Sequence, residues 1–210
     1  MIRRILFSIL PFLFFLPARV AAQDENEVLL SGMLDSAALS QQRVYRNLSD
    51  ALASPDSVYK LDLSKQKRKE VPDQIRNLKN LQVLKLSRNN LREIPAWIGE
   101  LVHLQVLDLG YNKITVLPDE IGKCREMVFL GLNRNLLETL PKTIGQLEKL
   151  RVIEMWDNEV NVLPEEIKYL HNLQVFELRG ILFSAQEQEQ IRSLLPETEI
   201  YFSPSCNCKN

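Results

Sequence analysis

Histidine and cysteine, which often catalyse reactions or bind metal ions, number only two and three in this 210-residue chain, and they form no catalytic constellation. The only histidines, His103 and His171, are far apart and lack cysteine or carboxylate companions at the spacing of a metal site. No glycine-rich phosphate-binding loop and no nucleophile motif at a strand-to-helix turn is present. The sequence therefore predicts a protein that is not an enzyme and that holds no cofactor or metal.

The chain has three cysteines, and an odd number leaves at least one thiol outside an intrachain disulfide. Cys124 occupies a position where related segments carry leucine, which indicates a buried apolar residue. Cys206 and Cys208 form a C-x-C pair near the C-terminus. They could form an intrachain disulfide, link two chains, or lie in a frayed tail. We expect a monomer, with a dimer linked through Cys206 or Cys208 as the alternative.

Residues suited to binding a partner recur at a fixed interval along the middle of the chain, beginning with Arg88 and Tyr111. Aromatic and arginine side chains are enriched at the energetic centres of protein interfaces, and acidic neighbours add charge selectivity. The predicted partner-binding residues are Arg88, Tyr111, Phe129, Arg134, Glu154, Trp156 and Asp157.

A repeat explains why these residues recur. Five blocks of equal length begin at Val58, Leu81, Leu104, Met127 and Leu150, and a sixth block begins at Leu173 and then diverges. Numbering each block from 1, apolar residues fall at places 1, 4, 6, 11, 14, 18 and 21, asparagine at place 9, proline at place 15 and isoleucine at place 18. A fixed period of this length is typical of a solenoid, in which each repeat is stable only when its neighbours cover it.

The places within a block predict its local structure. Apolar residues at places 4 and 6, with variable residues between and around them, indicate a short strand that buries one face. Proline at place 15 fits the first position of a short helical segment. The asparagines at place 9 follow the strand, where a buried amide can bond backbone groups of its own coil and the next one. These asparagines are Asn89, Asn112, Asn135 and Asn158.

The segment "LQVLKLSRNNLREIPAWIGEL", which starts at Leu81, resembles the leucine-rich repeat in the 23-residue variety of Ras-associated scaffold proteins. The resemblance covers about residues 58–183 and implies an α/β fold, a curved right-handed solenoid with a parallel sheet on its concave side and short helices on its convex side. Together with the apolar N-terminus it suggests an exported bacterial-type repeat protein. It further implies that places 3, 5, 7 and 8 face the concave side and bind a protein or peptide.

Charge on this predicted concave face is uneven. The whole chain is nearly neutral, with 26 basic and 27 acidic residues, which gives no reason to expect nucleic acid as a partner. The N-terminal blocks nevertheless place basic residues on the face, and the C-terminal blocks place acidic ones there. These residues are Lys60, Lys65, Lys85 and Arg88 at one end, and Glu154, Asp157 and Glu177 at the other.

The two ends of the chain differ from the repeats. Residues 1–22 combine two early arginines, an apolar run of about 13 residues and small residues, which is the pattern of a secretory signal peptide. An uncleaved membrane anchor is the alternative, although the apolar run is shorter than the ~20 residues of a membrane-spanning helix. After this segment we expect a flexible mature N-terminus at 23–40 and a capping helix at 41–57. The C-terminal end should have a cap at 184–203, with a capping box and a last strand, and a tail at 204–210. The six repeats between the caps are 58–80, 81–103, 104–126, 127–149, 150–172 and 173–183 (partial).

The sequence thus predicts an exported, non-enzymatic module that binds a protein or peptide on its concave face. Two alternatives stay open. The chain could be an inhibitor or co-factor of an enzyme outside the cytoplasm, or a structural or adhesion protein of the cell envelope. Export would place the protein outside the cell, in the periplasm or at the envelope, with no membrane span after removal of the signal peptide.

Overall fold

The computed structural model describes residues 34–205, so the signal peptide predicted at 1–22 and the Cys206 and Cys208 pair lie outside the described residues. The chain divides into two compact units, residues 1–42 and 43–210. The described part of the first unit contains helix α2 (Ser36–Gln41), whose N-cap Asp35 accepts a hydrogen bond of 2.7 Å from the N–H of Ala38. Helix α2 therefore overlaps the end of the segment 23–40, which the sequence predicted to be flexible.

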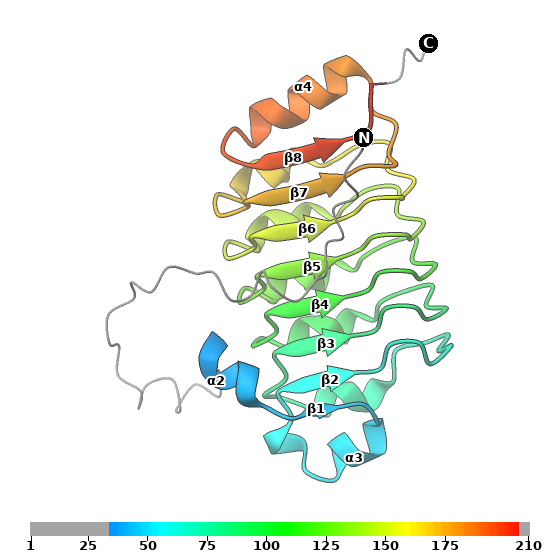
Figure 1. Cartoon of the computed structure of the whole chain (residues 1–210), viewed down its shortest axis with the longest axis vertical. Coiled ribbons are helices and arrows are strands. Elements are labelled where there is room, and N and C mark those ends of the chain that lie inside the picture. The colour runs from blue at the N-terminus through cyan, green and yellow to red at the C-terminus, as the bar shows by residue number, and fades with distance from the viewer. Residues whose placement is uncertain (1–33, 206–210) are drawn as a thin grey trace, which may run out of the picture. The chain divides into compact units, whose positions relative to one another are not determined.

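The second unit is built on one parallel sheet of eight strands, which follow one another in chain order from β1 to β8 (Figure 1). Strands β2 to β6 are three residues long and occupy places 3 to 5 of successive blocks. The strands are β1 (Val44–Tyr45), β2 (Lys60–Asp62), β3 (Val83–Lys85), β4 (Val106–Asp108), β5 (Phe129–Gly131), β6 (Val152–Glu154), β7 (Val175–Leu178) and β8 (Glu199–Phe202).

The register of the sheet equals the period of the sequence. Val83 pairs with Val106, which holds the same place in the following block, and Leu84 pairs with Leu107. The middle residue of each repeat strand points into the core, and the residues on either side of it lie on the opposite face and are partly exposed, apart from the buried Gly131 and Glu177. Equal places of neighbouring blocks therefore form straight rows across the sheet.

The helical segment of each complete repeat is a 3-10 helix that lies behind the sheet (Figure 1). The proline at place 15 is the N-cap of this helix, whereas the sequence predicted that it would be the first helical residue. A 3-10 helix rises about 2.0 Å per residue, so five residues span the back of a coil. The helices are η2 (Asp73–Asn77), η3 (Ala96–Glu100), η4 (Asp119–Lys123), η5 (Lys142–Gln146) and η6 (Glu165–Tyr169).

One continuous apolar core lies between the sheet and these helices. It is formed by the leucines and isoleucines at the recurring apolar places, nearly all of which are fully buried. Cys124 is part of this core, as its place in the repeat predicted, and its thiol lies 3.4 Å from the carbonyl oxygen of Ile98. Burial raises the pKa of the Cys124 thiol to about 12, so it stays protonated and unreactive at neutral pH.

The N-terminal cap differs from the single helix predicted at 41–57. The segment instead forms strand β1, helix α3 (Leu48–Leu52) and a 3-10 helix, η1 (Pro55–Ser57). Val44, which the helical spacing placed on an apolar side, is 38% exposed, whereas Tyr45 is buried. The reason is that β1 pairs with β2 and satisfies a sheet edge that a helix would leave open.

The C-terminal cap has the elements predicted at 184–203. Helix α4 (Ala185–Leu194) begins after Ser184, and a capping box joins Ser184 and Glu187. The hydrogen bonds from the Ser184 hydroxyl and N–H hold the pKa of the Glu187 carboxyl below its usual value. Strand β8 then pairs with β7 and adds the last strand to the sheet.

Candidate functional site

The face of the sheet opposite the 3-10 helices is the concave face of the solenoid. Places 3 and 5 project from its strands, and places 7 and 8 follow at the end of each strand. Place 8 has a positive φ in all six blocks: Lys65 (61°), Arg88 (58°), Tyr111 (59°), Arg134 (54°), Asp157 (55°) and Gly180 (79°). For residues other than glycine this conformation costs roughly 1 kcal/mol each, so the turn that ends each strand is strained in five of the six blocks.

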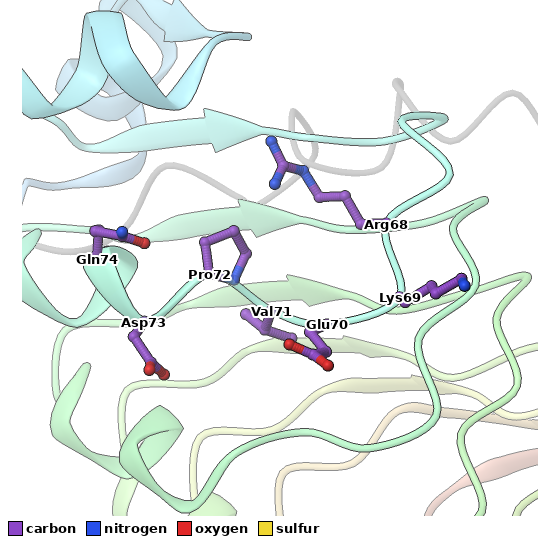
Figure 2. A pocket seen from close by; sticks show the side chains of 7 residues that line it. All are labelled: Arg68, Lys69, Glu70, Val71, Pro72, Asp73 and Gln74. Atoms are coloured by element: carbon purple, nitrogen blue, oxygen red, sulfur yellow. The ribbon is translucent and has the colours of Figure 1, made fainter.

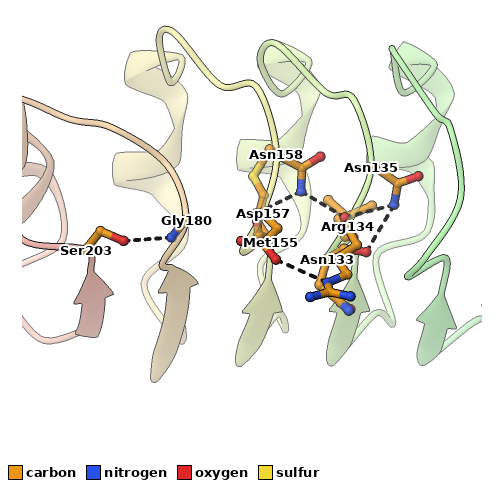
Figure 3. A network of polar contacts seen from close by, with 9 residues as sticks. Asn133, Arg134, Asn135, Met155, Asp157, Asn158, Gly180 and Ser203 are labelled. Atoms are coloured by element: carbon orange, nitrogen blue, oxygen red, sulfur yellow. Dashed lines mark hydrogen bonds and ion pairs between the residues drawn. The ribbon is translucent and has the colours of Figure 1, made fainter.

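The asparagines at place 9 hold these turns together. The Nδ2 of Asn135 donates to the carbonyl of Leu132 in its own coil (2.9 Å) and to that of Leu109 in the preceding coil (3.1 Å). Its Oδ1 accepts from the N–H of Ile114, also in the preceding coil (3.0 Å). Figure 3 shows Asn135 and Asn158 at equivalent places beyond the strand ends.

The other three asparagines make the same kind of contacts. Each donates to carbonyls of two coils and accepts an N–H from the preceding coil: Asn89, Asn112 and Asn158. The amides thus bond their own coil and the preceding one, whereas the sequence predicted their own coil and the next. They are structural residues, and they position the place-8 side chains beside them.

Four of the predicted partner-binding residues form a continuous cation–aromatic row, which we define as Arg88, Tyr111, Arg134 and Trp156. The Arg88 guanidinium lies 4.3 Å from the centre of the Tyr111 ring. The Arg134 guanidinium lies 5.1 Å from the Tyr111 ring and 5.3 Å from the Trp156 ring, and the two rings meet edge to face at 5.9 Å. Cations and rings therefore lie side by side across four coils.

Asp157 joins this row through an ion pair of 3.1 Å between its Oδ2 and the Nε of Arg134 (Figure 3). Both side chains are about half exposed, so this pair contributes little to the free energy of unfolding, ~0.5 kcal/mol. The row is preorganised by several such weak contacts rather than by burial, and its outer surfaces stay accessible to a partner.

Phe129 and Glu154, the other two predicted residues, lie on the sheet itself and outside the row. Phe129 opens β5, and its ring covers Gly131, where an added Cβ would come 3.0 Å from the ring. Glu154 closes β6. Burial, followed by the negative charges of Asp108 and Glu177, raises the pKa of the Glu154 carboxyl above its usual value.

The sequence interpretation overlooked an apolar row at place 3. We call it the place-3 stripe: Val83, Val106, Phe129, Val152 and Val175. These five residues pair in register across β3 to β7, and all are partly exposed. The signal was present in the sequence, because four of five consecutive blocks carry valine at a place that the fold turns away from the core. A partly exposed row of valine and phenylalanine side chains is suited to contact with an apolar surface.

The basic end of the face has its own electrostatic signature. Burial, followed by the charge of Lys85, lowers the pKa of the Lys60 ammonium. The same coil also has a hollow of about 600 Å³ that is lined by seven consecutive residues, 68–74. Figure 2 shows their side chains along one continuous segment of the first coil, from a loop into the start of η2. The hollow lies along a single segment and brings no separate elements together, so it has no arrangement suited to catalysis.

Metal and membrane features are absent from the part of the chain that the structure describes. Residues 34–205 contain no group of three or more histidine, cysteine or acidic side chains placed to hold a metal ion. Within the same range no helix is both long and apolar enough to cross a membrane. His103 and His171 lie at the seams between blocks, partly or fully exposed.

Comparison with known proteins agrees with the fold. Residues 96–195 match a family model described as a leucine-rich repeat region, and residues 56–114 match a second model described as leucine rich repeat. No curated protein sequence gave a significant match.

Solved structures give the same result. A leucine-rich-repeat protein of Leptospira interrogans is 32% identical with a TM-score of 0.64, and the match covers 79% of this chain and 49% of that one. The leucine-rich-repeat domain of the type III effector XopL is 24% identical with a TM-score of 0.55, covering 60% of this chain and 46% of that one. The chain thus spans about half the length of these structures.

Proposed function

The chain belongs to the leucine-rich-repeat family over residues 56–195, and on this premise we propose that it is a non-enzymatic module that binds a protein or peptide on its concave face. Leucine-rich-repeat domains are generally protein-interaction modules. The observation that carries the proposal is the cation–aromatic row. Its side chains do not belong to the apolar core, yet they gather across adjacent coils. We also assign the repeats to the 23-residue class of Ras-associated scaffold proteins, because of the proline at place 15 and the isoleucine at place 18.

The two tryptophans of the chain allow a direct test. A partner captured on the wild-type protein should bind the Trp156→Ala variant at least ~2 kcal/mol more weakly, the usual scale of an interface hot spot. Thermal unfolding of this variant should change little, because Trp156 does not belong to the apolar core. Isothermal titration calorimetry and thermal unfolding measure the two quantities.

Trp97 is the matched control. It lies on the convex side in η3, packs against the core, and donates from Nε1 to Oδ1 of Asp73 at 2.8 Å. Trp97→Ala should therefore lower the melting temperature and leave the affinity unchanged. Normal binding by the Trp156 variant, together with weakened binding by the Trp97 variant, would move the site to the convex side.

We further propose that the protein is exported and acts in the extracellular space, the periplasm or the cell envelope. The support is the N-terminal sequence, with Arg3 and Arg4 before an apolar run and small residues before Gln23. The similarity to a Leptospira protein is in keeping with a bacterial origin. Mass spectrometry of the soluble protein from its host should find an N-terminus within a few residues of Gln23. An intact Met1 in that material would contradict export by cleavage.

A further inference from the structure

Two rows with different chemistry run next to each other on the concave face. The place-3 stripe is apolar. The neighbouring place-5 row is acidic from β4 to β7: Asp108, Gly131, Glu154 and Glu177 pair in register. Gly131 contributes no side chain, and the space beside it is taken by the Phe129 ring and the Asp108 carboxylate, 3.0 and 3.3 Å from where a Cβ would stand.

The carboxylates of this row differ in how well they are compensated. Glu177 forms an ion pair with Arg179, and the Oδ1 of Asp108 accepts from the N–H of Gly110 at 3.1 Å. The Glu154 carboxylate has no hydrogen bond or ion pair with any residue in the range 34–205, although it is partly buried. A partly buried carboxylate without a cation is unfavourable, and its raised pKa reflects this. A cation supplied by a partner would remove the penalty.

The spacing of the rows determines which backbone conformation of a partner fits them. Neighbouring strands lie about 4.8 Å apart, so the rows present one side chain every ~4.8 Å. An α-helix lying across the strands presents one side chain per turn, every ~5.4 Å, and drifts by only ~2 Å from β4 to β7. An extended peptide presents side chains of one face every ~6.7 Å and drifts by ~6 Å over the same strands. A helix of about three turns therefore fits, and an extended segment does not.

We propose that the concave face binds an amphipathic α-helix of a protein partner that lies across β4 to β7, with its apolar side on the place-3 stripe and lysine or arginine side chains over Asp108 and Glu154. This inference rests on the proposed function and specifies the chemistry of the partner. Lys85 and Arg88 lie on the adjacent coil and make the face basic there, so the match to a basic helix ends at β4.

Three synthetic peptides, each long enough for about five helical turns, test the inference against the full chain. The first is an alanine-based helix with leucines along one side and lysines beside them. The second replaces the lysines with glutamates, and the third places two prolines in the centre of the first. Fluorescence anisotropy of labelled peptides measures the affinity. The lysine helix should bind, and the other two should bind at least about tenfold more weakly, because they lose charge complementarity or helical structure.

Two protein variants locate the contact. Glu154→Gln should weaken binding of the lysine helix about three- to tenfold and reduce its dependence on salt. Glu165→Gln, at the start of η6 on the convex side, is the matched control and should bind normally. Equal binding of the glutamate or proline peptides, an unchanged affinity for Glu154→Gln, or no binding of any peptide at ~1 mM would overturn the inference.

The outcomes separate this inference from the proposed function. If a captured partner depends on Trp156 but the lysine helix does not bind, the concave face is the site and the helical class of partner is wrong. If binding of the captured partner is also unchanged by Trp156→Ala, both proposals fail.

Discussion

Places 8 and 9 of each block are neighbours in the chain, yet they obey opposite rules. Place 9 is asparagine in four blocks, and three of these side chains are buried with bonds to two coils. Place 8 has the same left-handed backbone in six blocks, but its residue is lysine, arginine, tyrosine, arginine, aspartate and glycine in turn. The fold dictates the side chain at place 9 and only the backbone at place 8. Place 8 is therefore free to carry the side chains of a binding site.

The largest expected effect is at place 9. Asn135 is 5% exposed, and its replacement by alanine leaves the buried N–H of Ile114 without a partner. It also removes one of the two asparagine donors from the carbonyls of Leu109 and Leu132, which keep their bonds to Asn112 and Asn158. Asn135→Ala should lower the free energy of unfolding by about 3 kcal/mol. Asn90, at place 10, has no side-chain hydrogen bond within residues 34–205, so Asn90→Ala should change stability by less than ~0.5 kcal/mol. Equal urea midpoints for the Asn135 and Asn90 variants would contradict the structural role of place 9.

At place 8 the backbone conformation itself should be measurable. Arg88 has φ 58°, and its side chain contacts the Tyr111 ring. Arg88→Gly and Arg88→Ala both remove that contact, but only glycine adopts this φ without strain. The glycine variant should be more stable than the alanine variant by about 1 kcal/mol in urea unfolding. A more stable alanine variant would show that the turn is not strained.

The contacts within the cation–aromatic row should be weaker still. A double-mutant cycle with Tyr111→Ala and Arg134→Ala isolates the contact between these two side chains, 5.1 Å apart. We expect a coupling free energy of about 0.5 kcal/mol, the scale of exposed cation–π pairs. Coupling above ~2 kcal/mol would mean that the row stabilises the fold. In that case place 8 would have a structural role as well, as place 9 does.

The smallest effect should come from Glu154 and should depend on pH. Its raised pKa means that the folded state favours the protonated carboxyl, so the ionised form lowers stability as pH rises through the ordinary carboxyl pKa to the raised value. Glu154→Gln should therefore raise the melting temperature at pH 7 by about 1–2 °C. Near pH 3.5, below the usual glutamate pKa of about 4.3, the difference should disappear. A gain that is equal at both pH values would rule out this electrostatic origin.

The repetition made much of the fold predictable. Leu84 and Leu107 occupy equal places, and the structure pairs them in the sheet. The capping box of Ser184 and Glu187 was also readable, because both partners lie within one turn of the chain. The N-terminal cap was not, since Val44 and Leu48 have helical spacing and only contact with β2 makes residues 44–45 a strand. Local pattern predicts structure where its partners are near in sequence or repeated.

The candidate face was predictable in its positions but less so in its contacts. Arg88, Tyr111 and Arg134 share place 8, so a common period puts them in one row. The contacts between the rings and the guanidinium groups depend on the left-handed turn. No residue type at place 8 predicts that turn in this sequence. The place-3 stripe was overlooked because a single valine on a strand is ordinary, and its meaning lies in the register of five strands.

Each place-9 asparagine bonds to the preceding coil, and this direction sets the order in which the loops form during synthesis on the ribosome. Asn158 accepts the N–H of Leu137 and donates to the carbonyl of Leu132, so a loop is satisfied only when the following coil has been added. Nascent chains should therefore complete each loop one coil late. Ile181 replaces asparagine in the last block and ends this dependence. Translation-arrested chains of increasing length should then gain protease resistance in steps of one whole block, and resistance that rises smoothly with length would contradict this order.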